Sequence, residues 1–131
     1  MRFLLIGVIS GLLATPAAAC NDTIFSVIDW RATVDKGQSG TSTTVEVDLR
    51  YDGKQGYRMI NAAAMLSDAI GNSLVSPRLV RDARVQPGDR FIISATFQDA
   101  IRLATIHRDD VSIRTCVWSI VYDDGTKEEF K

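Results

Sequence analysis

Hydrophobic and polar residues alternate along most of the chain after residue 20, and a period of two is typical of half-buried β-strands. The clearest run is 44–51, where Val45, Val47, Leu49 and Tyr51 would face one way and polar side chains the other. Six further ranges are expected to be strands: 26–34, 57–66, 74–80, 91–97, 111–122 and 127–131. Residues 98–110 lack this period, and 100–104 could form a short helical turn between sheets.

Turn signals separate these runs. Residues 36–42 are rich in Gly, Ser and Thr and predict a loop. The sequence QPGD at 86–89 predicts a type II turn, and DDGT at 123–126 predicts a hairpin. Three consecutive alanines would also allow a helix over 57–66, but the flanking turns leave room for only about ten residues, a strand length. The pattern predicts an all-β, two-sheet sandwich of about seven strands.

The same alternation predicts which large side chains lie in the core. On 26–34, Trp30 would share the inner face with Ile28, and the edge candidate 74–80 is interrupted by Pro77. Both faces of 111–122 are apolar, so this strand is expected to be central. Its inward set would be Cys116, Trp118, Ile120 and Tyr122. Both tryptophans and the methionines Met59 and Met65 are expected to fill the core.

The first 19 residues have the pattern of a secretory signal peptide. Arg2 precedes an apolar run, Pro16 ends it, and Ala17 and Ala19 suit a cleavage site. A membrane anchor is the alternative, but the run is shorter than the roughly 20 residues that cross a bilayer. We therefore expect a signal peptide at 1–19, one domain at 20–131, and a periplasmic or secreted protein.

Cleavage after Ala19 would leave Cys20 first, and two fates remain open for it. A disulfide with Cys116, the other cysteine of the chain, suits an exported protein and would close a loop of about 95 residues. Lipid attachment is the alternative, although Ala17 stands where lipoprotein signals usually have Leu. Only a lipidated Cys20 would place the protein on a membrane.

Composition limits the partners of the mature chain. Removing 19 of 131 residues leaves 112, and since Arg2 is the one charge removed, 14 basic and 16 acidic residues remain, a net charge of −2. Such a balance does not favour nucleic acid as a partner. The size fits a single domain.

Four segments carry a resemblance to a known group of proteins. Their order and turn chemistry resemble those of small exported immunoglobulin-like domains of bacteria. The resemblance implies an immunoglobulin-like sandwich and assigns no catalytic residue. The segments are INA at 60–62, SDAIGN at 67–72, QPGD at 86–89 and VYDDGT at 121–126.

Catalytic chemistry has little support in this sequence. His107 is the single histidine, and no Gly-x-Ser-x-Gly motif surrounds a serine. A small enzyme using His107 and Asp109 is therefore the least favoured hypothesis, and we expect no metal or other cofactor. The leading hypothesis is an exported, non-catalytic binding or assembly module with a protein partner. A lipid-anchored accessory domain of the cell envelope is the alternative.

Overall fold

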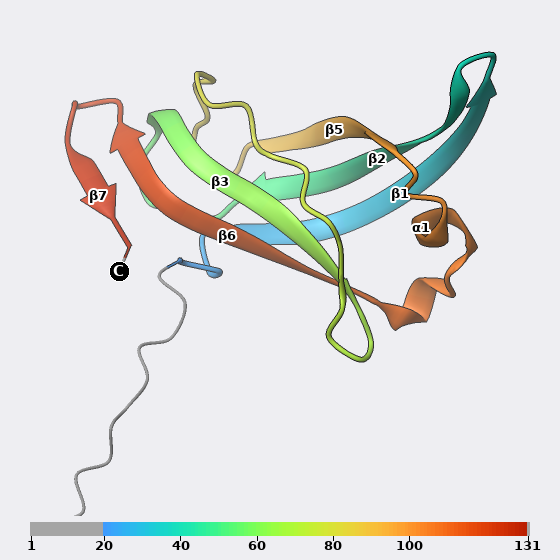
Figure 1. Ribbon diagram of the computed structural model, residues 1–131. Coiled ribbons are helices and arrows are strands. Elements are labelled where there is room, and N and C mark those ends of the chain that lie inside the picture. Colours follow the sequence, from blue (N-terminus) through green and yellow to red (C-terminus); the bar gives the residue numbers. More distant parts are fainter. Residues whose placement is uncertain (1–19, 131) are drawn as a thin grey trace, which may run out of the picture.

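The structure is a computed structural model that describes residues 20–130 (Figure 1). A four-residue helix, α1 (Arg102–Thr105), and a 3-10 turn (Arg108–Asp110) follow the fifth of seven strands. The strands are β1 (Phe25–Gly37), β2 (Gly40–Tyr51), β3 (Tyr57–Asp68), β4 (Ser73–Val75), β5 (Arg90–Gln98), β6 (Val111–Tyr122) and β7 (Lys127–Glu129). Within residues 20–130, no helix has the length and apolar character needed to cross a bilayer.

The strands form two antiparallel sheets, in the orders β1-β2-β5 and β4-β3-β6-β7. Figure 1 shows the two sheets stacked as layers, with β7 at one edge and the β1–β2 hairpin extending past the end of β5. This arrangement confirms the predicted all-β sandwich of two sheets. As expected, β6 is central and β4 is a short strand at the edge.

The space between the sheets holds the core. The inward face of β2 was predicted correctly, since Val45, Val47, Leu49 and Tyr51 are all at most 1% exposed. At one end, Tyr51 and Tyr57 meet edge to face with ring centroids 5.0 Å apart, and Phe25 packs against both. Burial of such apolar side chains is the main favourable contribution to folding.

A β-bulge in β1 corrects the predicted position of Ile28. Val27 pairs with Leu49 and Asp29 with Asp48, so Ile28 is an extra residue between two paired positions. It turns outward and is 39% exposed. The alternation resumes after it, and Trp30 packs against the core as expected.

A second bulge, in β6, corrects the predicted position of Trp118. Ala62 pairs with Val117 and Asn61 with Ser119, so Trp118 is the extra residue. Val117 belongs to the core, and its neighbour Cys116 therefore points outward. The expected inward set is thus divided. Ile120 and Tyr122 pack on the core, whereas Cys116 and Trp118 lie on the outer face.

The turns were predicted more accurately than the loops. Gly88 has φ +85° in the 86–89 turn, and Gly125 has φ +87° in the β6–β7 hairpin, as the turn signals require. The loop expected at 36–42 is wrong, because β1 continues to Gly37 and β2 starts at Gly40. The helical alternative for 57–66 is also wrong, because β3 pairs with β6 along its length. The helical turn expected within 98–110 is present as α1.

Cys20 and Cys116 are joined by a disulfide, with their Cα atoms 5.2 Å apart. Next to it, Asn21 and Val117 exchange two backbone hydrogen bonds of 2.9 Å each. The beginning of the described chain is therefore held on β6, beside β7. The signal peptide predicted at 1–19 lies outside the described residues and stays a prediction.

Candidate binding surface

The outer face of the four-stranded sheet carries large side chains that are not part of the core. Two of them, Met59 and Trp118, were expected inside, but Met59 is 42% exposed and Trp118 lies under Arg78. The Arg78 guanidinium stands 5.6 Å from the centre of the Trp118 ring and donates to Asn61 Oδ1 at 2.6 Å. We call this surface, made of Met59, Asn61, Arg78, Trp118 and Val121, the tryptophan face.

A shallow apolar hollow of about 250 Å³ lies on this face. Met59 and Val121 form its apolar part, and Arg81 and Lys127 stand at its rim. A second hollow of about 320 Å³ continues past Asn61 and Arg81 to Arg78. The two hollows share Ile60, Asn61 and Arg81, so they form one surface, and Arg78 connects it to Trp118.

The cations around the tryptophan face outnumber their acidic partners. Arg81 pairs with Asp82 at 3.0 Å, and Lys127 pairs with Glu129 at 2.7 Å. Arg78 makes its polar contact with the neutral Asn61. The surface therefore combines a tryptophan, a methionine and arginines, the residue types that are enriched in protein interfaces.

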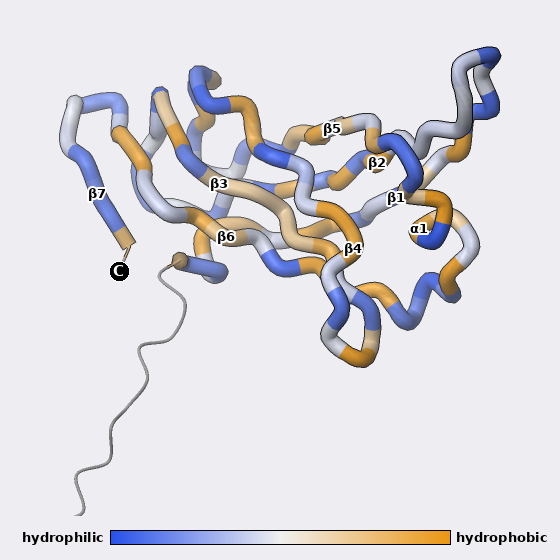
Figure 2. Tube along the Cα trace, viewed as in Figure 1, coloured by the Kyte–Doolittle hydropathy of each residue, from blue (hydrophilic) through white to orange (hydrophobic). Residues whose placement is uncertain are grey.

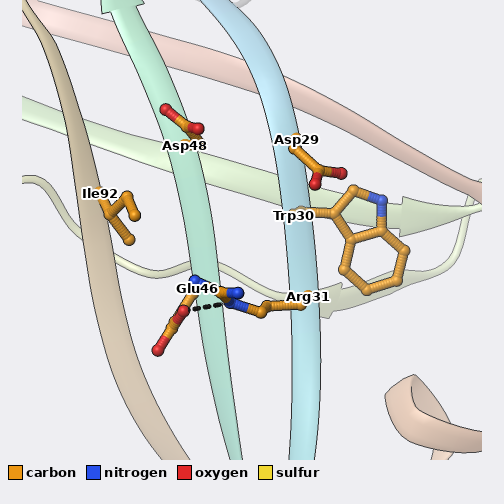
Figure 3. A pocket seen from close by; sticks show the side chains of 6 residues that line it. All are labelled: Asp29, Trp30, Arg31, Glu46, Asp48 and Ile92. Carbon is orange, nitrogen blue, oxygen red and sulfur yellow. Dashed lines mark hydrogen bonds and ion pairs between the residues drawn. The ribbon is translucent and has the colours of Figure 1, made fainter.

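The outer face of the three-stranded sheet is built differently (Figure 3). Its charged side chains form cross-strand ion pairs, and we call it the ion-pair face. Arg31 of β1 pairs with Glu46 of β2. Arg90 of β5 donates three hydrogen bonds to Asp48, from Nε to Oδ1 at 3.0 Å and to Oδ2 at 3.2 Å, and from Nη2 to Oδ2 at 2.7 Å.

Two like charges meet on the ion-pair face, and each has a cation of its own. Asp29 and Asp48 lie directly opposite each other on β1 and β2, an arrangement that by itself destabilises a sheet. Arg90 offsets the second charge, and its hydrogen bonds hold the pKa of Asp48 below the usual range, with a further contribution from the arginine charge. Arg108, from the loop after α1, reaches back to Asp29 and the Trp30 carbonyl.

His107 and Asp109 lie together on the surface loop between α1 and β6. Their side chains are 71% and 89% exposed, with His107 Nδ1 3.7 Å from Asp109 Oδ2. The Asp109 backbone N–H also donates to His107 Nδ1 at 3.2 Å. A pair this exposed does not form the enclosed pocket in which acid–base groups usually act. Among residues 20–130, no three His, Cys, Asp or Glu side chains are grouped to hold a metal ion.

Among residues 20–130, Asp68 is the one carboxyl group whose side chain is buried. At 4% exposure it accepts hydrogen bonds from the backbone N–H groups of Asn72 and Ile70 and from the side chains of Asn72 and Arg102. These bonds, the Asn72 backbone bond first, lower the pKa of Asp68 to about 2. The network closes the β3–β4 turn and ties α1 to it, so its role is structural.

Comparisons with family models, with curated proteins and with solved structures give no match to this chain. The candidate surface is therefore assigned from its own residues.

Sequence reasoning missed the tryptophan face because it placed Trp118 and Met59 in the core. One signal was present, since both faces of 111–122 are apolar. That pattern fits a strand covered on both sides, and it equally fits a strand with one face in the core and one exposed for binding. The bulge places Trp118 on the outer face, and the alternation of hydrophobic and polar residues does not indicate this bulge.

Proposed function

We propose that this chain is an exported, non-catalytic binding module whose protein partner contacts the tryptophan face. The observation that carries the proposal is the exposed apolar hollow of Met59 and Val121 beside Trp118 and its stacked Arg78. Trp and Arg are the residues in which binding energy concentrates at interfaces. The exported setting is supported by the disulfide between Cys20 and Cys116, since such bonds persist in oxidising compartments.

The two other hypotheses have less support. Lipid attachment needs the Cys20 sulfur, which the disulfide already uses. An enzyme built on His107 and Asp109 would have both groups in open solvent.

A photoreactive side chain placed at Met59 tests the proposal in the cell that makes the protein. We expect irradiation to link Met59 variants to one discrete partner. The matched control is Ile28, which is exposed to a similar extent, 39% against 42%, but lies on the three-stranded sheet. Equal labelling from both positions, or none from Met59, would overturn the proposal.

A second variant separates binding from folding. Trp118→Ala should abolish the Met59 cross-link, because it removes the ring on which Arg78 rests, and should leave a cooperative melting curve. Val117→Ala, one residue away on the core side of the same strand, should lower the melting temperature and keep the cross-link.

A further inference from the structure

One long edge of β5 has no neighbouring strand among the described residues, because β5 pairs with β2 alone (Figure 1). The Tyr51 N–H donates to the Asp89 carbonyl, so the odd-numbered residues of β2 direct their backbone groups toward β5. The β2–β5 register has no shift. The N–H and C=O groups of Ile92, Ser94 and Thr96 therefore point away from β2, toward the open edge.

The other sheet edges carry features that discourage pairing. β1 has its bulge, and Arg108 occupies the Trp30 carbonyl on the open side. β4 and β7 are three residues long, β4 is followed closely by Pro77, and all residues of β7 are charged, as its blue colour in Figure 2 shows. Residues 91–97 contain no charge, proline or glycine, and their pairing has no bulge. An edge of this kind is an aggregation hazard unless another chain covers it.

The sequence of this edge is complementary to itself. Residues 91–97 read FIISATF, which is nearly symmetric in side-chain type about Ser94. An antiparallel copy centred on Ser94 would pair Ile92 with Thr96 and Ser94 with Ser94, the positions whose backbone groups are free. Aromatic and β-branched cross-strand pairs are favourable in sheets, and no like charges would meet.

A hollow at one end of the edge has room for an aromatic side chain of the second copy. It measures about 270 Å³ and lies between β5 and residues 79–85, lined by Phe91, Ile93, Leu79 and Val85 among others. In the pairing centred on Ser94, Phe97 of the second copy lies opposite Phe91 and so beside this hollow. The exposed part of that ring would cover the hollow, and the symmetry repeats this contact at the equivalent hollow of the other copy.

We propose that two copies of this chain pair antiparallel through β5, with Ser94 on the two-fold axis, so that the two three-stranded sheets become one continuous sheet. A two-fold pairing of this kind is closed and leaves neither β5 edge open. It uses the edge of the sheet opposite the tryptophan face, and it is independent of the function proposed for that face. The test needs the purified protein alone.

Sedimentation and amide exchange test the self-pairing directly. We expect a dimer at micromolar concentration, with the Ile92, Ser94 and Thr96 amides exchanging far more slowly in the dimer than after dilution to monomer. A chain that stays monomeric, with these three amides exchanging fast at high concentration, would overturn the proposal. Another polypeptide found on the edge of a monomeric chain would overturn it too.

Ser94→Pro should give a folded monomer, because the Ser94 N–H points to the open edge and its loss spares the bonds to β2. Ala32→Pro is the matched control. The Trp30 carbonyl accepts from Arg108 and therefore points to the open edge of β1, as do the backbone groups of the even-numbered residues that follow it. Ala32→Pro thus removes an N–H from an edge that the proposed dimer does not use, and this variant should remain dimeric. Circular dichroism checks that both variants fold. A dimeric Ser94→Pro variant contradicts the proposal.

Cysteine substitution tests the position of the axis. Paired Cα atoms about 5.5 Å apart suit a disulfide, so Ser94→Cys should link the two copies on oxidation. Thr96→Cys should not, because the two equivalent positions would be four residues out of register, about 13 Å along the strand. Linking through Thr96→Cys with none through Ser94→Cys would place the axis elsewhere and refute this pairing.

Discussion

The two outer faces of the sandwich differ in how they use their polar and apolar side chains. On the ion-pair face, Arg31, Glu46, Asp48 and Arg90 contact one another across strands. On the tryptophan face, the prominent side chains are apolar or contact a neutral group, as Arg78 contacts Asn61. On the first face the charged side chains are paired with one another, although Ile28 and Ile92 are also exposed there. The second exposes an apolar hollow whose burial would gain free energy, which is why we propose that a partner binds there.

The two faces also differ in how much the structure near them contributes to the stability of the fold. Exposed ion pairs contribute about 0–1 kcal/mol each, so the ion-pair face adds little to stability. Beside Trp118 on the four-stranded sheet, however, lie the disulfide and the backbone pair of Asn21 with Val117. The four-stranded sheet therefore carries both a structural tie and the candidate binding surface.

The largest effect is expected from breaking that tie. Cys116→Ser removes the covalent link between Cys20 and β6 and reopens a loop that spans 96 positions. The chain-entropy model gives a loss of about 3–5 kcal/mol in the free energy of unfolding, which should lower the melting temperature by more than about 10 °C. Melting curves of the variant and the wild-type protein measure it.

Cys20→Ser is the control, because it removes the same bond and should therefore have the same melting temperature as Cys116→Ser. Thiol titration of denatured, unreduced wild-type protein should find no free thiol. Two free thiols, or variants that melt like the wild type, would show that the disulfide is absent or contributes nothing.

A smaller effect is expected at low pH, at Asp68. Its pKa is about 2 in the folded state, below the ordinary aspartate value of 3.8, so its contribution to stability is complete above the higher value. That contribution is lost as the pH falls from about 4 toward 2 and the carboxylate is protonated. Asp68→Asn should therefore melt lower than the wild type at pH 7, and the difference should shrink toward pH 2.

Asp109→Asn is the matched control, because Asp109 is 89% exposed and outside this network. Its melting temperature should follow that of the wild type throughout the range. A difference between Asp68→Asn and the wild type that stays constant from pH 7 to 2 would contradict the ionic role of Asp68.

The sequence predicted the fold well wherever alternation runs without interruption. The inward face of β2 and the Phe91 to Phe97 face of β5 follow from period two alone, and the turns at 86–89 and 123–126 follow from glycine chemistry. The disulfide partners followed from counting cysteines.

The candidate binding surface could not be predicted in the same way. One extra residue in a strand reverses every following side chain, and neither Ile28 nor Trp118 carries a local signal of its bulge. The paired charges on β1 and β2 were visible only as polar positions, because their partners depend on cross-strand register. The open edge of β5 likewise depends on which strands become neighbours, and alternation within one strand does not contain that information.

The smallest effect is expected on the ion-pair face, and it is the sharpest test of the contrast between the two faces. Glu46→Gln keeps the size of the side chain and removes its charge, leaving Arg31 without its ionic partner. Both side chains contact solvent, at 34% and 66% exposure, so water and salt replace much of the interaction. The free energy of unfolding should change by less than about 0.5 kcal/mol, and this difference should vanish in roughly 1 M salt, where screening is strong.

Cross-linking from Met59 should be unchanged, because Glu46 lies on the other sheet. Denaturant titrations at low and high salt measure the first two outcomes. A loss above about 1.5 kcal/mol would be larger than exposed pairs give. It would mean that the ion pairs hold the fold, and the division of roles between the two faces would then fail.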